Sequence, residues 1–422
     1  MNWEELNQQA IDFMMNGEYD KAYDSAGQAL AAAQAANDDE QQAISLSNMG
    51  FIDEYLKDYD GAEKAFKDAL SVMERLHDDD EETAELLTNI SDCMVENDRQ
   101  TGGNSHLNEA SEILRRALKI YEDKRGTEDP VFADTLAKQA EIFAAQGALD
   151  PAKMLYAESV DILRKFLKND NPQLASRILR LAQLYQINGD MEKTEELLVE
   201  ASGIFKRAKA ENSLEAAQVE NDLGELYMAK EEFDKAGPLF DHALTVRENN
   251  MKEDDPALAQ SLNNMAVYLG NEGDIKKSIE LHKRALDMRK RLFGDKHPAV
   301  TQSLENLASV YQSNGKMEEA EQLLRESAQI WKEYAGEDNP AYAQTMFDLG
   351  TVLFIRGKHR ESEKIVTACK DIMEPHLGQD NPSMFMVYKA LATIAETLHK
   401  KEDQDKYTEL YMNILKNVEN KN

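Results

Sequence analysis

Residues 256–298 read PALAQSLNNMAVYLGNEGDIKKSIELHKRALDMRKRLFGDKHP and contain one full period of a repeated pattern. Apolar residues recur at helical spacing over 256–270 and again over 275–293, which predicts two amphipathic helices. The residues between them, 271–274, predict a turn, and Asp274 is a residue type that caps the start of a helix. The stretch therefore predicts a helix–turn–helix unit.

Prolines mark the same unit along most of the chain. They recur at intervals of 42 residues, or twice that, and Leu214 stands where the series lacks one. Proline suits the first position of a helix, so each is expected to open a unit. The series consists of Pro130, Pro172, Pro256, Pro298, Pro340 and Pro382. The ten predicted units are residues 1–38, 39–79, 80–128, 129–170, 171–212, 213–254, 255–296, 297–338, 339–380 and 381–422.

Two units depart from the pattern. The third is seven residues longer than the period of 42, and we interpret the Gly-rich segment 98–104 as a mobile loop between its helices, with a binding loop as the alternative. The last has Lys400–Asp403 where a glycine turn is expected. Because a terminal repeat needs a polar outer face, 382–422 is expected to cap the array.

A small residue recurs midway along the first helix of every unit, and large apolar residues follow in the second. Small side chains let two helix axes approach closely, and the large ones fill the remaining space. The small positions are Ala10, Gly50, Ser91, Ala140, Ala182, Gly224, Ala266, Ala308, Gly350 and Ala392.

This order of small and large residues resembles the tetratricopeptide repeat. In the unit that begins at Pro298, the matching residues are Leu304, Leu307, Ala308, Tyr311, Ala320 and Leu324. The period of 42, with LNNMA at 262–266 and GDKHP at 294–298, is similar to the kinesin-light-chain variety. The resemblance covers essentially the whole chain. It implies an all-α, right-handed superhelical solenoid whose first helices line a concave groove.

The composition excludes several classes of partner. A net charge of −32 disfavours nucleic acid and anionic membranes. Residues 1–100 hold 25 acids and 6 bases, a net −19, which either keeps the protein soluble or attracts a basic partner. The two cysteines are 276 positions apart, and neither a signal peptide nor an apolar run of membrane length is visible, so we expect a cytoplasmic protein.

No catalytic or nucleotide-binding motif is present in the sequence. Cys93 and Cys369 fall at positions expected to face the core. We therefore expect no enzymatic activity, no cofactor and no metal.

Polar residues on the first helices provide the strongest functional signal. Asparagine and glutamine can donate and accept hydrogen bonds together, so they can hold an extended peptide backbone, as the resemblance also implies. Three cations near the middle of the array suit an acidic segment of a partner. The predicted partner-binding residues are Lys138, Arg177, Arg180, Asn221, Gln260, Asn263, Asn264, Gln302 and Asn306. The alternative is that these polar residues only keep the groove solvated and bind no partner.

The one basic stretch, 276–296, has an excess of five positive charges and falls mostly on a second helix. We interpret it as a solvated face, with an outer docking site, or contact with the acidic N-terminal third of another copy, as the alternatives. The sequence as a whole predicts a protein-interaction scaffold or adaptor that binds a peptide or protein in its groove. The alternatives are a regulatory or chaperone-type subunit that wraps a partner, and an enzyme with its site in the insertion.

Overall fold

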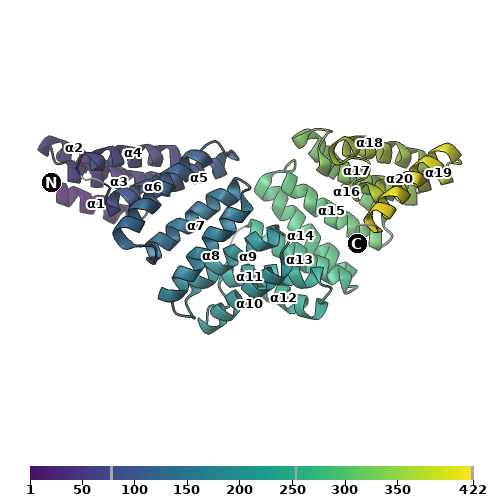
Figure 1. Ribbon diagram of the computed structural model, residues 1–422, viewed down its shortest axis with the longest axis horizontal. Helices are drawn as coiled ribbons and strands as arrows, with labels where there is room; N and C mark the ends of the chain where they lie inside the picture. Colours follow the sequence, from purple (N-terminus) through teal and green to yellow (C-terminus); the bar gives the residue numbers. More distant parts are fainter. Residues whose placement is uncertain (77–78, 252–253, 420–422) are drawn as a thin grey trace. The chain divides into compact units, whose positions relative to one another are not determined.

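The computed structural model describes residues 1–76, 79–251 and 254–419, and these form twenty α-helices and no strands (Figure 1). The first ten are α1 (Trp3–Met15), α2 (Tyr19–Ala36), α3 (Asp39–Tyr55), α4 (Tyr59–Leu76), α5 (Glu81–Thr101), α6 (Leu107–Arg125), α7 (Pro130–Ala145), α8 (Leu149–Phe166), α9 (Pro172–Ile187) and α10 (Met191–Arg207). The other ten are α11 (Leu214–Ala229), α12 (Phe233–Asn250), α13 (Pro256–Asn271), α14 (Ile275–Phe293), α15 (Pro298–Ser313), α16 (Met317–Ala335), α17 (Pro340–Ile355), α18 (His359–Leu377), α19 (Met384–Thr397) and α20 (Lys401–Glu419). The predicted all-α solenoid is confirmed.

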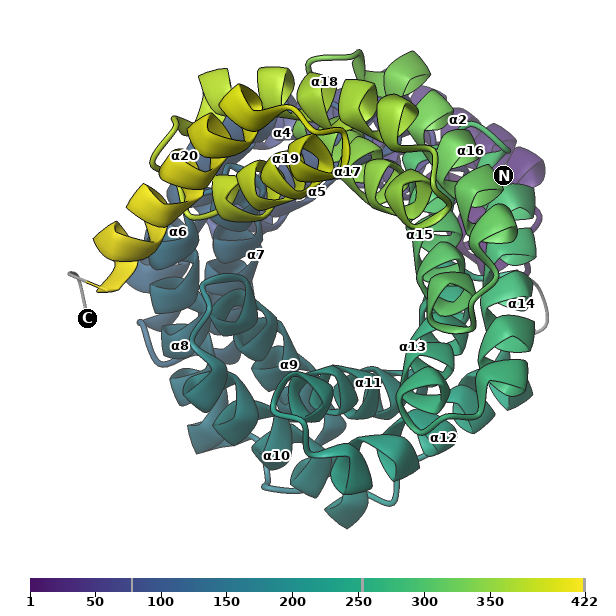
Figure 2. The same ribbon diagram turned by 90° about the vertical axis from the view of Figure 1, so that its right-hand side faces the viewer.

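The chain divides into two compact units, Met1–Glu211 with α1–α10 and Asn212–Asn422 with α11–α20. Within each unit, helices pack on their neighbours in sequence. The odd-numbered helices form one layer and the even-numbered helices the other, as α13 to α20 show most clearly (Figure 2). We call the surface of the odd-numbered layer the odd-helix face of its unit.

The predicted helix starts have a local cause. Proline occupies the first turn of α7, α9, α13, α15 and α17, and the residue before it caps the helix in each case. Asp255, for example, accepts a hydrogen bond from the backbone N–H of Ala257 at 2.7 Å. The last proline of the series differs, because α19 begins two residues after Pro382.

The prediction of a mobile loop over 98–104 is wrong for its first half. Helix α5 continues to Thr101 and ends at Gly102, whose φ of 70° is in the left-handed region. The buried carboxylate of Asp98 accepts hydrogen bonds from the backbone N–H of His106 at 2.8 Å and from Ser105 Oγ at 3.1 Å. These bonds tie the connection to the end of α5.

The small positions lie in the core, and helices cross closely at two of their glycines. All ten are buried. A Cβ atom added to Gly50 would lie 2.7 Å from the ring of Phe66 in α4, and one added to Gly224 would lie 2.5 Å from the ring of Phe240 in α12. Such distances are well inside van der Waals contact, so these two sites accept only glycine without a shift of the ring.

The last helix does not present the uniformly polar surface expected of a cap. Met412, Leu415 and Val418 of α20 are each 39% exposed. Among the described residues, no helix is both long enough and apolar enough to cross a membrane.

Candidate partner-binding surface

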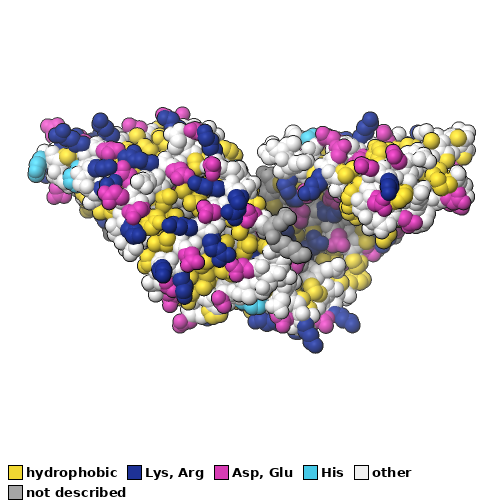
Figure 3. Space-filling view, turned by 180° about the vertical axis from the view of Figure 1, so that it is seen from behind, with side chains coloured by type: hydrophobic (Ala, Val, Ile, Leu, Met, Phe, Trp, Pro, Cys, Tyr) yellow, Lys and Arg dark blue, Asp and Glu magenta, His cyan; other side chains and the backbone are white. Residues whose placement is uncertain are grey.

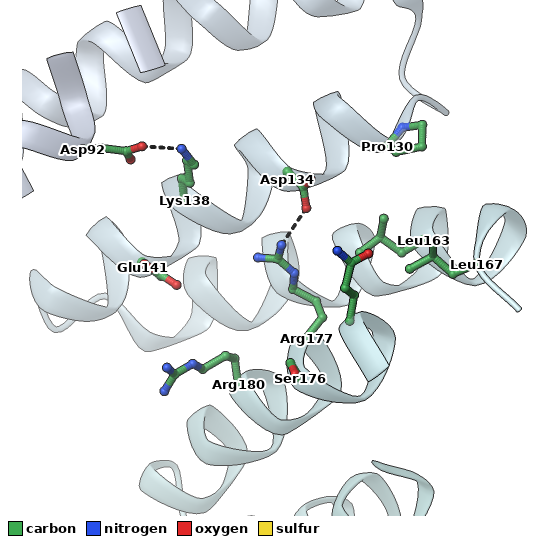
Figure 4. A pocket seen from close by; sticks show the side chains of 11 residues that line it. Asp92, Pro130, Asp134, Lys138, Glu141, Leu163, Leu167, Ser176, Arg177 and Arg180 are labelled. Carbon is green, nitrogen blue, oxygen red and sulfur yellow. Dashed lines mark hydrogen bonds and ion pairs between the residues drawn. The ribbon is translucent and has the colours of Figure 1, made fainter. Parts of the chain in front are cut away.

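In the unit Met1–Glu211, the structure brings the three predicted cations together. Lys138 of α7 and Arg177 and Arg180 of α9 line one pocket of about 560 Å³ on the odd-helix face (Figure 4). Asp92 of α5 also lines this pocket. This part of the prediction depended on the 42-residue register, which places equivalent positions of consecutive repeats side by side.

Carboxylates that the sequence analysis did not assign neutralise two of these cations. Lys138 pairs with Asp92 in the preceding repeat. Arg177 Nη2 donates to Asp134 Oδ1 at 2.6 Å (Figure 4). A signal was available for Asp134, because it occupies the same register as Gln260, a predicted groove residue.

Burial shapes the electrostatics of this pocket. It raises the pKa of Asp92, and Lys138 acts in the opposite direction. Arg180 is exposed, and its Nη1 donates to Gln183 Oε1 at 3.3 Å. Within the described part of the chain, no carboxylate lies within ion-pair distance of Arg180. Its guanidinium is therefore the cation of the pocket best able to meet an acidic group from outside.

In the unit Asn212–Asn422, the predicted asparagines bond to one another and to other polar side chains, among them Glu225 and His282. Asn264 Nδ2 donates to Asn221 Oδ1 at 3.0 Å, and Asn306 Nδ2 donates to Asn263 Oδ1 at 2.9 Å, each across 43 residues of sequence. Asn221, Asn263 and Asn264 are only 1%, 4% and 8% exposed. Asn48 and Asn7 form the same bond, at 2.7 Å, in the other unit. These asparagines link consecutive repeats, and most of their amide groups are not open to solvent.

The predicted glutamines have two different environments. Gln260 Oε1 accepts a hydrogen bond from Arg289 Nη2 at 2.8 Å. Gln302 is exposed. The difference follows from the second helix. In the next repeat, Trp331 occupies the position of Arg289, and it has no guanidinium that could donate to Gln302.

Arg289 is a correction to the prediction of a solvated basic stretch. It is 5% exposed, and its other nitrogen donates to Ser303 Oγ at 2.9 Å. Arg247, one period earlier, is 2% exposed and donates to Gln218 Oε1 at 2.6 Å. Burial lowers the pKa of both guanidinium groups. Sequence reasoning missed this pair, although Phe205 and Trp331 occupy the same register in other repeats and indicate a core position.

Much of the rest of that basic stretch pairs with acids of neighbouring repeats. Three of the pairs, each at 2.8 Å, are Arg284 with Glu248, Lys290 with Glu326 and Lys296 with Glu333; Arg291 pairs with Asp254 as well. Positive and negative side chains are likewise interspersed over the surface seen in Figure 3. Paired charges at an exposed face contribute little to stability and leave little net field for an acidic partner.

The remaining candidate chemistry is limited. In the ranges that the structure describes, no group of three or more His, Cys, Asp or Glu side chains is arranged to hold a metal ion. Burial raises the pKa of the Cys93 and Cys369 thiols to about 12, so both remain protonated at neutral pH.

Comparison with solved structures gives three informative neighbours. The repeats of a putative kinesin light chain from Podospora anserina are 20% identical over 49% of this chain and 98% of that one, with a TM-score of 0.44. BtubC (BKLC) from P. vanneervenii is 24% identical over 55% of this chain and 91% of that one, with a TM-score of 0.45. A signal-transduction ATPase with a tetratricopeptide repeat sensor from Pyrococcus horikoshii is 16% identical over 85% of this chain and 51% of that one, with a TM-score of 0.56. At such identities these likenesses concern the fold alone.

No curated protein matches the sequence. The tetratricopeptide repeat model, in contrast, matches six overlapping segments, residues 5–75, 41–101, 174–249, 215–291, 257–311 and 299–374. Together these matches extend over 5–101 and 174–374, well over half of the chain. The repeat register, the close crossings at the small positions and this match lead to one conclusion: the chain belongs to the tetratricopeptide repeat family.

Proposed function

We propose that this protein is a non-catalytic scaffold or adaptor that holds an extended segment of a protein partner against its odd-helix faces. Tetratricopeptide repeats generally mediate protein–protein interaction, which supports the general role. The observation that carries the specific proposal is the pocket of Lys138, Arg177 and Arg180, in which Arg180 is exposed and has only an amide as its hydrogen-bond acceptor.

The partner segment in this pocket carries a carboxylate. Arg180 offers it a charge-assisted bond directly, and Arg177 offers a second if the carboxylate competes with Asp134. Each such bond contributes roughly 1.5–3 kcal/mol. Lys138 positions the surface through its pair with Asp92.

The polar residues of the other unit contribute in two ways. Gln302 is exposed and Asn306 is half-buried, so we assign them to the backbone of the bound segment. Asn221 and Asn264 link neighbouring repeats through their bond, and Asn263 does so by accepting from Asn306. Gln260 donates to Asn264 within α13 and so helps to hold it in place. Each unit carries its own part of the proposed surface.

Arg180→Glu tests this proposal. A partner is first isolated from the native host by affinity capture, its bound segment is mapped, and the segment is titrated by calorimetry. We expect Arg180→Glu to weaken binding at least tenfold, because about 1.4 kcal/mol corresponds to a factor of ten. Lys276→Glu, on the exposed surface of α14, is the matched charge reversal and is expected to leave the affinity unchanged. Equal affinities of Arg180→Glu and the wild type would remove this pocket from the binding mechanism.

We also propose that the acidic N-terminal third attracts a basic region of a partner. Its odd-helix face has a second pocket, of about 160 Å³, between α3 and α5, where Glu82 and Glu85 accompany Ile44 and Phe51. The net charge of −19 over residues 1–100 supports a long-range electrostatic attraction.

A further inference from the structure

A pocket of about 320 Å³ opens on the odd-helix face of the unit Asn212–Asn422, between α17 and α19. Its wall is mostly apolar and includes Phe347, Phe354, Val366 and Ile394. This contrasts with the ion-paired pocket around Arg180. The size is at the lower end of the range for ligand sites, and it suits one large side chain.

The repeat register explains why the pocket occurs here. Met386 and Ala390 of α19 occupy the positions held by Gln344 and Asp348 one repeat earlier. The short side chain of Ala390 leaves space that a longer polar residue would fill. Met386 is 55% exposed and lines the same pocket as Phe347 and Phe354, so its side chain extends their apolar surface.

One carboxylate lies in this apolar wall. Asp348 accepts a hydrogen bond from Gln344 Nε2 at 3.3 Å, and no cation of the described residues lies within ion-pair distance of it. Lys389 also lines the pocket, but its ammonium lies over the ring of Phe385, 5.7 Å from the ring centroid. Burial, and then the nearby Glu305, raise the pKa of Asp348 to about 6. A carboxylate held in apolar surroundings without a cation is stabilised by a ligand that supplies one.

We propose that this pocket binds an arginine side chain of an extended partner segment. The aliphatic stem packs on Val366 and Ile394, the guanidinium bonds to the Asp348 carboxylate, and its planar face stacks on the phenylalanine rings. The inference rests on the proposed scaffold function. It adds a second recognition element of opposite charge to the acidic group proposed for Arg180.

Methyl NMR of the full chain with ¹³C-methyl methionine tests the proposal, and Met386→Leu identifies the Met386 signal. The probes are N-acetyl-arginine amide and N-acetyl-norleucine amide, which share an unbranched aliphatic stem but differ in charge. We expect a saturable shift of the Met386 signal with the arginine probe, and at least tenfold weaker binding of the norleucine probe. Equal binding of the two probes, or no shift with either, would overturn the proposal.

Three variants refine the test. Asp348→Asn is expected to reduce binding of the arginine probe at least tenfold, and Glu396→Gln, which removes an exposed acid of α19 outside the pocket lining, should not. Ala390→Gln fills the pocket with a polar side chain, a residue class that this register accepts in the other repeats, and should abolish the shift. Undiminished binding to Asp348→Asn would overturn the assignment of the carboxylate.

The Met386 methyl shift, together with calorimetry of the native partner segment, separates this inference from the proposed function. Arg180→Glu should retain the Met386 shift while it loses the native partner. If Asp348→Asn binds the native segment as well as the wild type does, and Arg180→Glu does not, the arginine pocket is wrong and the scaffold function stands. If Asp348→Asn loses the native segment while Arg180→Glu binds it as well as the wild type does, the Arg180 site is wrong and the arginine pocket stands.

Discussion

Gly224 provides a quantitative test of how closely the helices approach. A Cβ atom at this position would lie 2.5, 2.8 and 2.9 Å from three ring atoms of Phe240, which is itself 2% exposed and cannot move freely. Gly224→Ala therefore overpacks the core at a cost of about 1–3 kcal/mol. Alanine's better helix propensity offsets about 0.5–1 kcal/mol of this cost. We expect a net destabilisation of up to about 2.5 kcal/mol.

The chain offers matched controls. Gly27 lies inside α2, and an added Cβ would meet nothing within 4 Å, so Gly27→Ala should stabilise by about 0.5–1 kcal/mol. Leu324 occupies the register of Phe240 in a repeat whose small residue is Ala308. Gly224→Ala should therefore become neutral or stabilising when it is combined with Phe240→Leu.

Urea unfolding followed by circular dichroism at 222 nm measures these effects. A solenoid need not unfold in a single two-state transition. Variants are therefore compared by the shift of the urea midpoint, provided that the dependence of the unfolding free energy on urea concentration is the same. The reasoning is refuted if Gly224→Ala and Gly27→Ala shift the midpoint in the same direction, or if Phe240→Leu leaves the effect of Gly224→Ala unchanged. Either result would mean that the ring does not contact the glycine backbone.

Two further predictions concern charge. Burial opposes ionisation of Glu321, but bonds from Lys358, Arg325 and Arg356 outweigh it and lower its pKa from 4.5 to about 2. Glu321→Gln should therefore destabilise the protein at neutral pH by roughly 1–3 kcal/mol. The difference in unfolding free energy from the wild type should disappear as the pH falls from 4.5 through 2, which urea unfolding over a pH series measures. A difference independent of pH would contradict this. For residues 1–100, with their net −19, affinity for a basic test protein should fall steeply between 0.05 and about 0.5 M salt, since the screening length shortens to a few ångströms; calorimetric binding that persists in 1 M salt would leave solubility as the role of this charge.

The helices of this protein were predictable because their signals are local. Proline at the first turn, a capping residue before it and an apolar stripe each act within one or two turns, so α14 begins and ends at the predicted residues. The small positions were equally visible, because a repeated fold imposes the same close crossing at each recurrence of the period. The pocket of Lys138, Arg177 and Arg180 followed from the same register.

The tertiary structure alone decided which polar side chains are paired within the protein and which remain free to bind a partner. Lys138 pairs with Asp92 across 46 residues, Asn264 with Asn221 across 43, and Arg289 turns into the core to reach Gln260. None of these partners lies on the same helix, so helical periodicity carries no information about them. A long polar side chain satisfies its hydrogen bonds with whichever group the next helix brings within about 3 Å, and that depends on the packing of neighbouring repeats.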